Sequence, residues 1–290
     1  MSVFRLYGAN TPMIIDACMF FNEVEMLELR LNVLNDTVSQ FVIVESLERF
    51  GSPLRKEPIF FNNKERFKKF EHKINYVVLP QLFPRYTDVA SGWQREKHQR
   101  EALYHESKMW AMQHAINHDP MNDILICSDV DEIPNPEVLK QNLDKISKSI
   151  HRLDLDFFYY NVNSYVGKWP WGTTVGPMSE YEKCGGSHQA RSNGYHDTKR
   201  VIADAGWHFS YFGGVDKIKD KVKSFSHSKD QIAIDLFSRT DADLKADIKD
   251  RRDLYRRSDM NQFEHRSADD PRLPKYFLEN RDKFPHFVEE

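Results

Sequence analysis

Four acidic residues follow or end apolar stretches that have the composition of buried strands. Asp129 and Asp131 come after residues 124–127, Glu23 lies shortly after residues 13–18, and Glu45 ends residues 41–45. The carboxyl ends of neighbouring parallel strands meet at one edge of a sheet, so we expect these acids to lie near one another. Two carboxylates about 4 Å apart repel by about 4 kcal/mol at an effective dielectric constant near 20. A divalent cation offsets this repulsion, and Mg²⁺ or Mn²⁺ takes carboxylate oxygens together with phosphate oxygens. The pattern therefore predicts a site for a metal ion and a phosphorylated ligand.

The Asp-x-Asp pattern at residues 129–131 also has other interpretations. Most such patterns are surface turns or helix caps with no catalytic role. A phosphatase of the haloacid dehalogenase type also places Asp-x-Asp after a strand and uses the first aspartate as its nucleophile. In that class the motif usually falls near the first strand and continues with Thr or Val, whereas Glu132 and Ile133 follow Asp131 here. The metal site remains the interpretation that we prefer.

The elements around these acids predict an α/β fold. Apolar runs with strand character occur at residues 13–18, 41–45, 76–79, 124–127, 156–160 and 206–212. Helical patterns occupy residues 93–117, 136–147 and 241–257 and the segment after Asn22, where Asn22 and Glu25 predict an N-cap. Continuous apolar strands that alternate with amphipathic helices indicate a mainly parallel sheet with helices on both faces. Residues 161–193 are rich in Gly, Pro, Ser and Asn and predict an irregular cover over the sheet.

Composition limits the class of protein. The 290 residues carry a formal charge of −3 and are 40% hydrophobic, as in an ordinary globular chain. No basic run suggests a nucleic-acid partner, and no stretch is apolar enough to span a membrane. We expect no signal peptide and a cytoplasmic location, with Cys18 and Cys127 reduced on buried strands. Aromatic residues make up 13% of the chain. Most of them belong in the core, but Trp169 and Trp171 are candidates to pack on a sugar ring.

The sequence resembles glycosyltransferase family 17, whose best-known members add bisecting GlcNAc to glycoproteins as β-1,4-mannosyl-glycoprotein N-acetylglucosaminyltransferases. The matching stretches lie across nearly the whole chain: Phe21-Asn22-Glu23, Val44-Glu45-Ser46, Trp93, Gln99-Arg100, residues 128–134, Gly206-Trp207-His208-Phe209-Ser210 and Pro274-Lys275-Tyr276.

The resemblance implies a GT-A fold with a Rossmann-like sheet, a UDP-sugar donor, a divalent metal (Mn²⁺ or Mg²⁺) and inversion at the anomeric carbon. It also implies one domain over residues 1–290. In that domain residues 1–135 would bind the nucleotide sugar, residues 136–240 would hold the acceptor and the catalytic groups, and residues 241–290 would form a helical tail. GlcNAc would be transferred to a glycan hydroxyl. The alternatives are another donor sugar, or a catalytically silent glycan- or nucleotide-binding protein on the same scaffold. We expect this chain, unlike the animal members, to lack a membrane anchor and a stem.

With the family as a guide, roles can be predicted for the donor site. Asp131 would bind the metal directly, and Asp129 would contact the metal's water shell or the ribose. Glu23 and Glu45 would receive the uridine. Arg100 would neutralise part of the diphosphate, or it would form only an ion pair on the surface of its helix.

Inversion needs a base that deprotonates the acceptor hydroxyl. Asp216 follows Gly213-Gly214 and begins a predicted helix, whose N-terminus would keep its carboxylate ionised. The alternative is a plain N-terminal helix acid, with Glu180 and Asp197 as further candidates for the base. His208 or His227 would complete the metal site, and His208 would otherwise serve the acceptor or the diphosphate. A lone histidine is more often structural.

Overall fold

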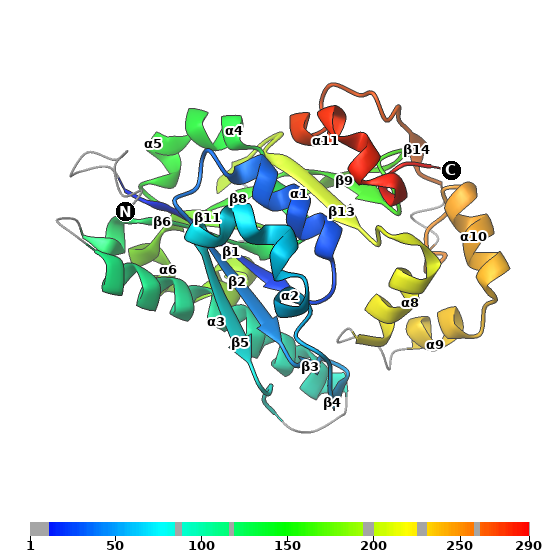
Figure 1. Ribbon diagram of the computed structural model, residues 1–290, viewed down its shortest axis with the longest axis horizontal. Helices are drawn as coiled ribbons and strands as arrows, with labels where there is room; N and C mark the ends of the chain where they lie inside the picture. The colour runs from blue at the N-terminus through cyan, green and yellow to red at the C-terminus, as the bar shows by residue number, and fades with distance from the viewer. Residues whose placement is uncertain are drawn as a thin grey trace.

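The computed structural model describes residues 12–84, 89–115, 119–193, 200–224, 231–257 and 262–289. It has an α/β architecture with two main sheets and helices packed around them (Figure 1). The predicted α/β class is therefore confirmed. Across the described ranges, no helix has the length and apolar character that a membrane crossing requires.

The larger sheet has seven strands in the order β12-β8-β11-β6-β1-β2-β5. The strands are β1 (Ile14–Phe20), β2 (Gln40–Ser46), β5 (Ile74–Leu79), β6 (Ile124–Asp129), β8 (His151–Leu153), β11 (Thr174–Pro177) and β12 (Val201–Ile202). The β5, β2, β1 and β6 strands are parallel neighbours, and β11 lies antiparallel to both β6 and β8. The four predicted apolar strands thus form the parallel core of a mixed sheet.

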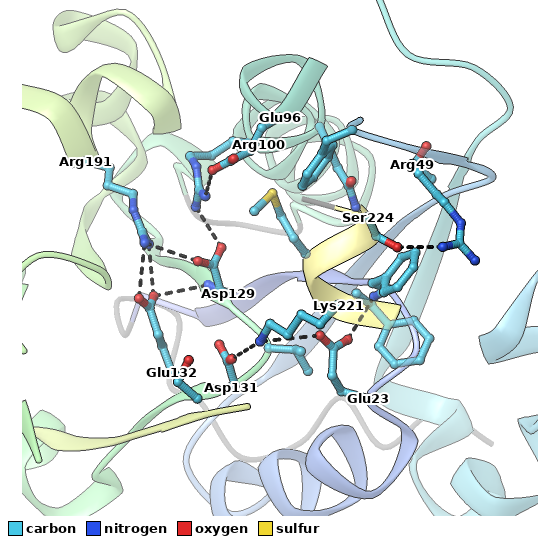
Figure 2. Close-up of a pocket in the computed structure, with 18 of the residues that line it drawn as sticks. Glu23, Arg49, Glu96, Arg100, Asp129, Asp131, Glu132, Arg191, Lys221 and Ser224 are labelled. Atoms are coloured by element: carbon cyan, nitrogen blue, oxygen red, sulfur yellow. Dashed lines mark hydrogen bonds and ion pairs between the residues drawn. The ribbon is translucent and has the colours of Figure 1, made fainter. Parts of the chain in front are cut away.

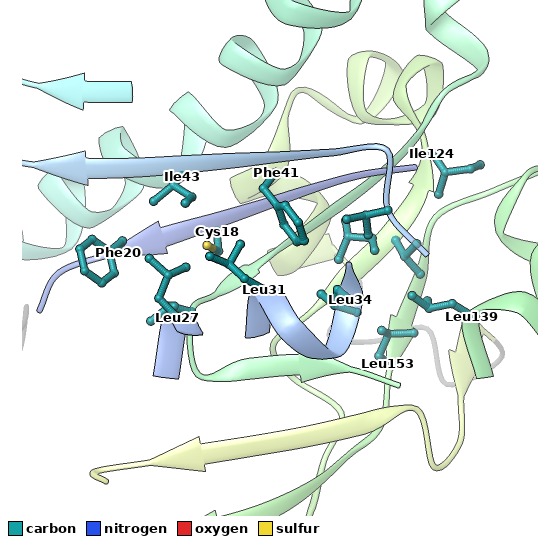
Figure 3. Packing of buried hydrophobic residues seen from close by; sticks show 14 of the residues in the cluster. Cys18, Phe20, Leu27, Leu31, Leu34, Phe41, Ile43, Ile124, Leu139 and Leu153 are labelled. Carbon is teal, nitrogen blue, oxygen red and sulfur yellow. The ribbon is translucent and has the colours of Figure 1, made fainter. Parts of the chain in front are cut away.

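Helices cover both faces of this sheet because successive strand residues point to opposite sides. Leu27, Leu31 and Leu34 of α1 (Val24–Leu34) pack on alternate strand residues such as Cys18 and Ile43 (Figure 3). The intervening strand residues pack on α3 (Val89–His114). Fully burying one such leucine contributes about 1.5–3 kcal/mol. The predicted two-sided cover is confirmed.

The start of α1 differs from the predicted cap. The residue before the helix is Glu23, not Asn22, and its side chain forms no capping bond to the helix. Its Oε2 instead accepts hydrogen bonds from the backbone N–H groups of Phe21 and Asn22, at 3.2 and 3.0 Å. Asn22 donates its side-chain amide to Asp220, 198 residues away. A tertiary contact has taken the side chain that the local pattern assigned to the cap.

The smaller sheet has five strands in the order β14-β10-β9-β13-β7. They are β7 (Glu132–Pro134), β9 (Leu155–Tyr159), β10 (Ser164–Trp169), β13 (Gly206–Ser210) and β14 (Glu264–His265). Residues 161–193 are therefore not irregular, because they also contain β11, α6 (Met178–Cys184) and α7 (Ser187–Asn193). Since β6 of the larger sheet leads through two residues into β7 of the smaller one, the turn at Val130 and Asp131 joins the sheets.

Shorter elements complete the described chain. A two-stranded ribbon pairs β3 (Glu48–Arg49) with β4 (Ser52–Arg55). The predicted helix at 136–147 is divided into α4 (Pro136–Gln141) and α5 (Leu143–Ile146). The remaining helices are α2 (Ile59–Asn62), α8 (Gly214–Ser224), α9 (Gln231–Phe237), α10 (Asp241–Lys249), α11 (Lys275–Glu279) and the 3₁₀ segments Lys64–Lys73, Pro120–Asn122, Arg281–Lys283 and Pro285–Phe287. The predicted helix at 241–257 thus ends at Lys249, and Arg251 has a positive φ of 53°.

Candidate functional site

A cavity of about 300 Å³ lies where β1, β2 and β6 of the larger sheet end. Its described lining comes from those strand ends, from α3, α7 and α8, and from β10 and β13 of the smaller sheet. Figure 2 shows charged side chains from these elements converging on the turn after β6. This is the edge of the sheet at which the acidic residues were expected.

A fully buried arginine fixes the backbone of the Asp129–Asp131 turn. Arg30 of α1 forms two hydrogen bonds with Asp16 of β1, at 2.6 and 2.8 Å, and donates to Ser128 Oγ at 2.6 Å. The same guanidinium donates to the backbone carbonyls of Asp129 and Glu132, at 3.0 and 2.7 Å. One planar group therefore holds the backbone on both sides of the Asp129–Asp131 turn.

Asp129 faces two arginines. Its Oδ1 accepts a hydrogen bond from Arg100 of α3 at 2.9 Å, and its Oδ2 accepts one from Arg191 of α7 at 3.1 Å. Partial burial raises the pKa of the Asp129 carboxyl, but the two guanidinium groups outweigh this effect and hold the pKa below its usual value. Asp129 is therefore ionised at neutral pH.

Asp131 is nearly buried and faces a lysine. Its Oδ2 accepts a hydrogen bond from Lys221 Nζ of α8 at 2.6 Å, and the same ammonium lies 3.8 Å from Glu23 Oε1 (Figure 2). On the other side, Oδ1 of Asp131 is 3.8 Å from Nε2 of His208. Burial lowers the pKa of Lys221, but Asp131 and Glu23 raise it by more, so the lysine is charged.

His208 stacks on Phe157 with ring centroids 4.7 Å apart and planes 9° from parallel. Burial lowers the pKa of His208 more than the neighbouring Asp131 raises it, so the imidazole is neutral at pH 7. In the described part of the chain, its buried Nδ1 has no hydrogen-bond partner. A neutral ring with its Nε2 towards a carboxylate can ligate a cation.

Glu132 is a third acid at the turn and is fully buried. It accepts hydrogen bonds from Arg191 at 2.9 Å and from the Trp169 indole at 2.9 Å. The backbone at Gly172 comes so close that a Cβ there would lie 1.8 Å from Glu132 Oε1. Only glycine fits this approach. Glu132 therefore anchors Arg191 and the 169–172 segment at the cavity wall.

The charges of the described lining residues do not balance. Six carboxylates line the cavity with four permanently charged cations, which leaves a formal charge of −2. The carboxylates are Glu23, Glu48, Glu96, Asp129, Asp131 and Glu132, and the cations are Arg49, Arg100, Arg191 and Lys221. Glu48 also pairs with buried Arg95, which is not among the described lining residues, at 3.6 Å. The protein's own cations thus offset most of the repulsion between the carboxylates, and the carboxylates still outnumber the cations by one.

The donor set at this turn fits a hard cation that is completed by its ligand. Over the described residues, no three His, Cys, Asp or Glu side chains stand together as a ready metal site. Mg²⁺ characteristically needs only one or two protein carboxylates and takes its other oxygens from phosphates and water. Asp131 supplies such a carboxylate, His208 a neutral nitrogen, and Lys221 already places a positive charge against Asp131. Asp129 has both oxygens bonded to arginines and fits the predicted outer contact better than a direct one.

The structure brings together Glu23, Arg100, Asp129, Asp131 and His208, all of which line the cavity. Arg100 also pairs with Glu96 on its own helix, so both predicted roles of Arg100, ion pair and cavity cation, are compatible with its position.

Glu45 has a different environment from the one expected. It is fully buried, pairs with Lys56, and accepts hydrogen bonds from the Ile59 and Phe60 N–H groups and from the Tyr76 hydroxyl. It is not among the described lining residues, whereas Ser46 is. Glu45 thus joins β2, β5 and the start of α2, and its position gives no support to a uridine contact.

Asp216 also lies away from the cavity. It is exposed in the first turn of α8 and is not among the described lining residues. Glu180 is half-buried, pairs with Lys183 on α6, and is likewise not among the described lining residues. Asp197 and His227 lie outside the described residues. The predicted base therefore receives no support from the geometry.

Three charged residues that form ion pairs at the turn were assigned no role from the sequence: Glu132, Arg191 and Lys221. Glu132 had a local signal, because it directly follows the Asp-x-Asp pattern. The two cations had none, since Arg191 lies 62 residues from Asp129 and Lys221 lies 90 residues from Asp131.

Aromatic side chains form the less polar part of the lining. Phe21, Phe50 and Trp93 line the cavity, with the Arg49 guanidinium over the Phe21 ring, and Trp169 lines it beside His208. Trp171 is exposed, stacks with Arg152 and is not among the described lining residues. Of the two predicted sugar-packing tryptophans, only Trp169 is at the site.

Comparison with known proteins gives one strong result. The family model described as Glycosyltransferase family 17 matches residues 6–289, which is nearly the whole chain. No curated protein sequence matches the chain significantly.

Proposed function

Because this chain belongs to glycosyltransferase family 17, we propose that the cavity binds a nucleotide-sugar donor and that the protein transfers the sugar to a glycan hydroxyl. UDP-GlcNAc is the donor that we favour, on the resemblance described above. A GT-A arrangement, with the turn after β6 as its Asp-x-Asp motif, is part of this proposal. The mixed sheet and the position of the turn at its edge support it.

The observation that carries the proposal is the convergence of three cations on the turn. Arg100, Arg191 and Lys221 come from three different helices, and each pairs with an aspartate of the turn. Charge-assisted hydrogen bonds to phosphate are among the strongest that side chains form, and arginine matches phosphate in two-point geometry. A diphosphate at this turn could accept hydrogen bonds from the two arginines beside Asp129 and from the lysine beside Asp131.

A divalent cation belongs to the proposal as well. Asp131 and His208 would hold it, with Asp129 in the outer contact, and it would act as a Lewis acid for the departing phosphate. The excess of carboxylates over cations at the cavity supports this, because a diphosphate alone would add further negative charge. Manganese and magnesium both suit a carboxylate–phosphate ligand set.

The general base of an inverting transfer must reach the acceptor hydroxyl. Since Asp216 is exposed outside the cavity, a lining carboxylate is a better candidate. Glu23 and Glu96 are the ones that we propose, because their side chains are 20% and 21% exposed and their oxygens can meet an acceptor. Replacement of each by glutamine should separate the two, since only loss of the base removes transfer while donor binding persists.

The test begins with binding of UDP. Thermal unfolding with UDP, in the presence and absence of Mn²⁺, should show stabilisation of about 2.7 kcal/mol at a hundred times the dissociation constant. Asp131→Ala should lose the metal-dependent part, and Asp282→Ala, which removes an exposed carboxylate elsewhere, should keep it. Unchanged UDP binding in Asp131→Ala would show that the turn does not hold the metal.

Transfer itself is tested by a hydrolysis screen over UDP- and GDP-sugars, followed by acceptor glycans. A catalytically silent glycan-binding protein would respond to free sugars and would ignore UDP. An absence of both UDP binding and donor hydrolysis would overturn the proposed function.

A further inference from the structure

The ammonium group of Lys221 lies beside Asp131, where the proposed divalent ion would bind. Its ammonium is 2.6 Å from Asp131 Oδ2 and 3.8 Å from Glu23 Oε1, and its side chain is mostly buried. The group reaches this position from α8, whereas Asp131 lies in the turn between β6 and β7 (Figure 2). The pair is the shortest contact between Asp131 and any described cation.

Lys221 and an incoming divalent ion compete for the carboxylate of Asp131. Among the described residues, Asp131 has one charged partner, Lys221, and lies near the neutral His208, whereas Asp129 is held by two arginines. A divalent ion that binds Asp131 through Oδ2 must take the place of the ammonium, because this oxygen already accepts from Lys221 at 2.6 Å and two cations on one oxygen repel strongly. Lys221 is flexible, single-pointed and well suited to exchange partners, unlike the planar guanidinium groups beside Asp129.

We propose that Lys221 is a built-in counter-ion that holds Asp131 in the metal-free protein, yields this carboxylate to the divalent ion, and then turns to the phosphates of the donor. The inference rests on the proposed function, since it assumes a nucleotide diphosphate as the ligand. It assigns Lys221 two successive partners, Asp131 and the donor phosphates. It also explains how Asp131 can stay buried and ionised when no metal is bound.

The consequence is a strong coupling between metal and nucleotide. The metal alone must break the Lys221–Asp131 pair without supplying phosphate oxygens to the displaced ammonium, so the metal alone binds weakly. With the nucleotide present, the displaced ammonium binds phosphate oxygens, and these contacts compensate for the lost ion pair with Asp131. By thermodynamic linkage, UDP then raises Mn²⁺ affinity by the same factor by which Mn²⁺ raises UDP affinity.

The deciding experiment measures Mn²⁺ binding in the absence of nucleotide, by calorimetry and by electron paramagnetic resonance of the free ion. Lys221→Met should bind Mn²⁺ roughly tenfold or more tightly than the wild type, within the usual range of coupling between sites. The matched control is Lys223→Met, which removes the same charge from an exposed position on the same helix and should leave Mn²⁺ affinity unchanged. In Lys221→Met the mutual enhancement between UDP and Mn²⁺ should shrink by a similar factor.

A second variant covers the case in which Lys221→Met does not fold because Asp131 is left buried and unpaired. Lys221→Gln keeps a hydrogen-bond donor group, the amide NH₂, without the charge. Its thermal stability should rise with Mn²⁺ alone by more than that of the wild type. The double variant with Asp131→Asn should lose this response.

The outcomes separate the two proposals. If the wild type binds UDP with Mn²⁺ but neither Lys221 variant gains Mn²⁺ affinity, the counter-ion role is wrong and the proposed function stands. If the wild type binds no UDP with or without Mn²⁺, the proposed function fails first.

Discussion

Replacement of Arg30 by methionine tests the physical basis of the site. Arg30 and Asp16 form a pair in which both side chains are fully buried, and the guanidinium also holds carbonyls of the Asp129–Asp131 turn. Methionine fills similar volume but leaves the Asp16 carboxylate without its cation. We expect Arg30→Met to lower both the free energy of unfolding and the affinity for UDP.

The magnitude follows from the contacts. Removal of one partner of a buried pair costs about 3–5 kcal/mol, which is a large share of the roughly 5–15 kcal/mol that stabilises a typical protein. The carbonyls of Asp129 and Glu132 would also lose a donor, at about 1–3 kcal/mol for each group that stays unsatisfied. Replacement of Asp16 by valine in the same variant should therefore recover only part of the loss, because it restores nothing to those carbonyls.

The assay is urea unfolding followed by tryptophan fluorescence. At a slope of about 3 kcal/mol per M, the expected loss moves the midpoint down by roughly 1–2 M. Arg66→Met is the control, since Arg66 forms a surface pair with Glu28 that should contribute at most about 1 kcal/mol. A loss below about 1 kcal/mol in Arg30→Met, or complete recovery in the double variant, would refute the reasoning.

Three further substitutions test the assignments at and around the cavity. Arg191→Met should weaken UDP binding about 10- to 150-fold, as loss of a hydrogen bond to a charged group implies. The control Lys183→Met on α6 should leave UDP affinity unchanged. Equal affinities of the Arg191 variant and the wild type in isothermal titration would exclude Arg191 from the site. Asp216→Asn should change transfer by no more than about twofold, because the residue is exposed outside the cavity, and a steady-state assay in which it abolished turnover would restore Asp216 as the base. Glu45→Gln should lower the free energy of unfolding, measured in urea, by about 1–3 kcal/mol, because Glu45 is bonded to Lys56 and Tyr76. UDP affinity should stay the same. Weaker UDP binding with unchanged stability would place Glu45 in the donor site after all.

The parallel core of the fold could be predicted from sequence because its signal is local. The apolar runs that became β1, β2, β5 and β6 are continuous, and the helices between them carry a regular apolar stripe. Two strands of the smaller sheet, β9 and β13, were predicted from the apolar runs at residues 156–160 and 206–212, but β7, β10 and β14 were not. The β10 strand has the mixed sequence Ser164–Trp169, and its alternation is broken by an irregular register between Tyr165 and Gly167. Such strands are defined by their partners rather than by their own composition.

The site could be predicted only in part, for a related reason. The sequence identified the acids at the strand ends but could not tell which of them face the cavity. Glu45 and Ser46 are neighbours at the end of β2, yet Glu45 turns to Tyr76 and the start of α2 while Ser46 lines the cavity. Because successive strand residues point to opposite faces, a shift of one residue decides between a structural acid and a site residue.

The cations determine what the acids can do. Asp129 and Asp131 differ in position by two residues, but the chain supplies the first with two arginines and the second with one lysine. The guanidinium pair gives Asp129 a fixed geometry and keeps it ionised, which suits a residue that orients a ligand. A single flexible ammonium gives Asp131 a partner that can be exchanged, which suits a residue that binds an incoming cation. The division of roles within the Asp-x-Asp pattern therefore follows from the basic residues of α3, α7 and α8, none of which lies near it in the sequence.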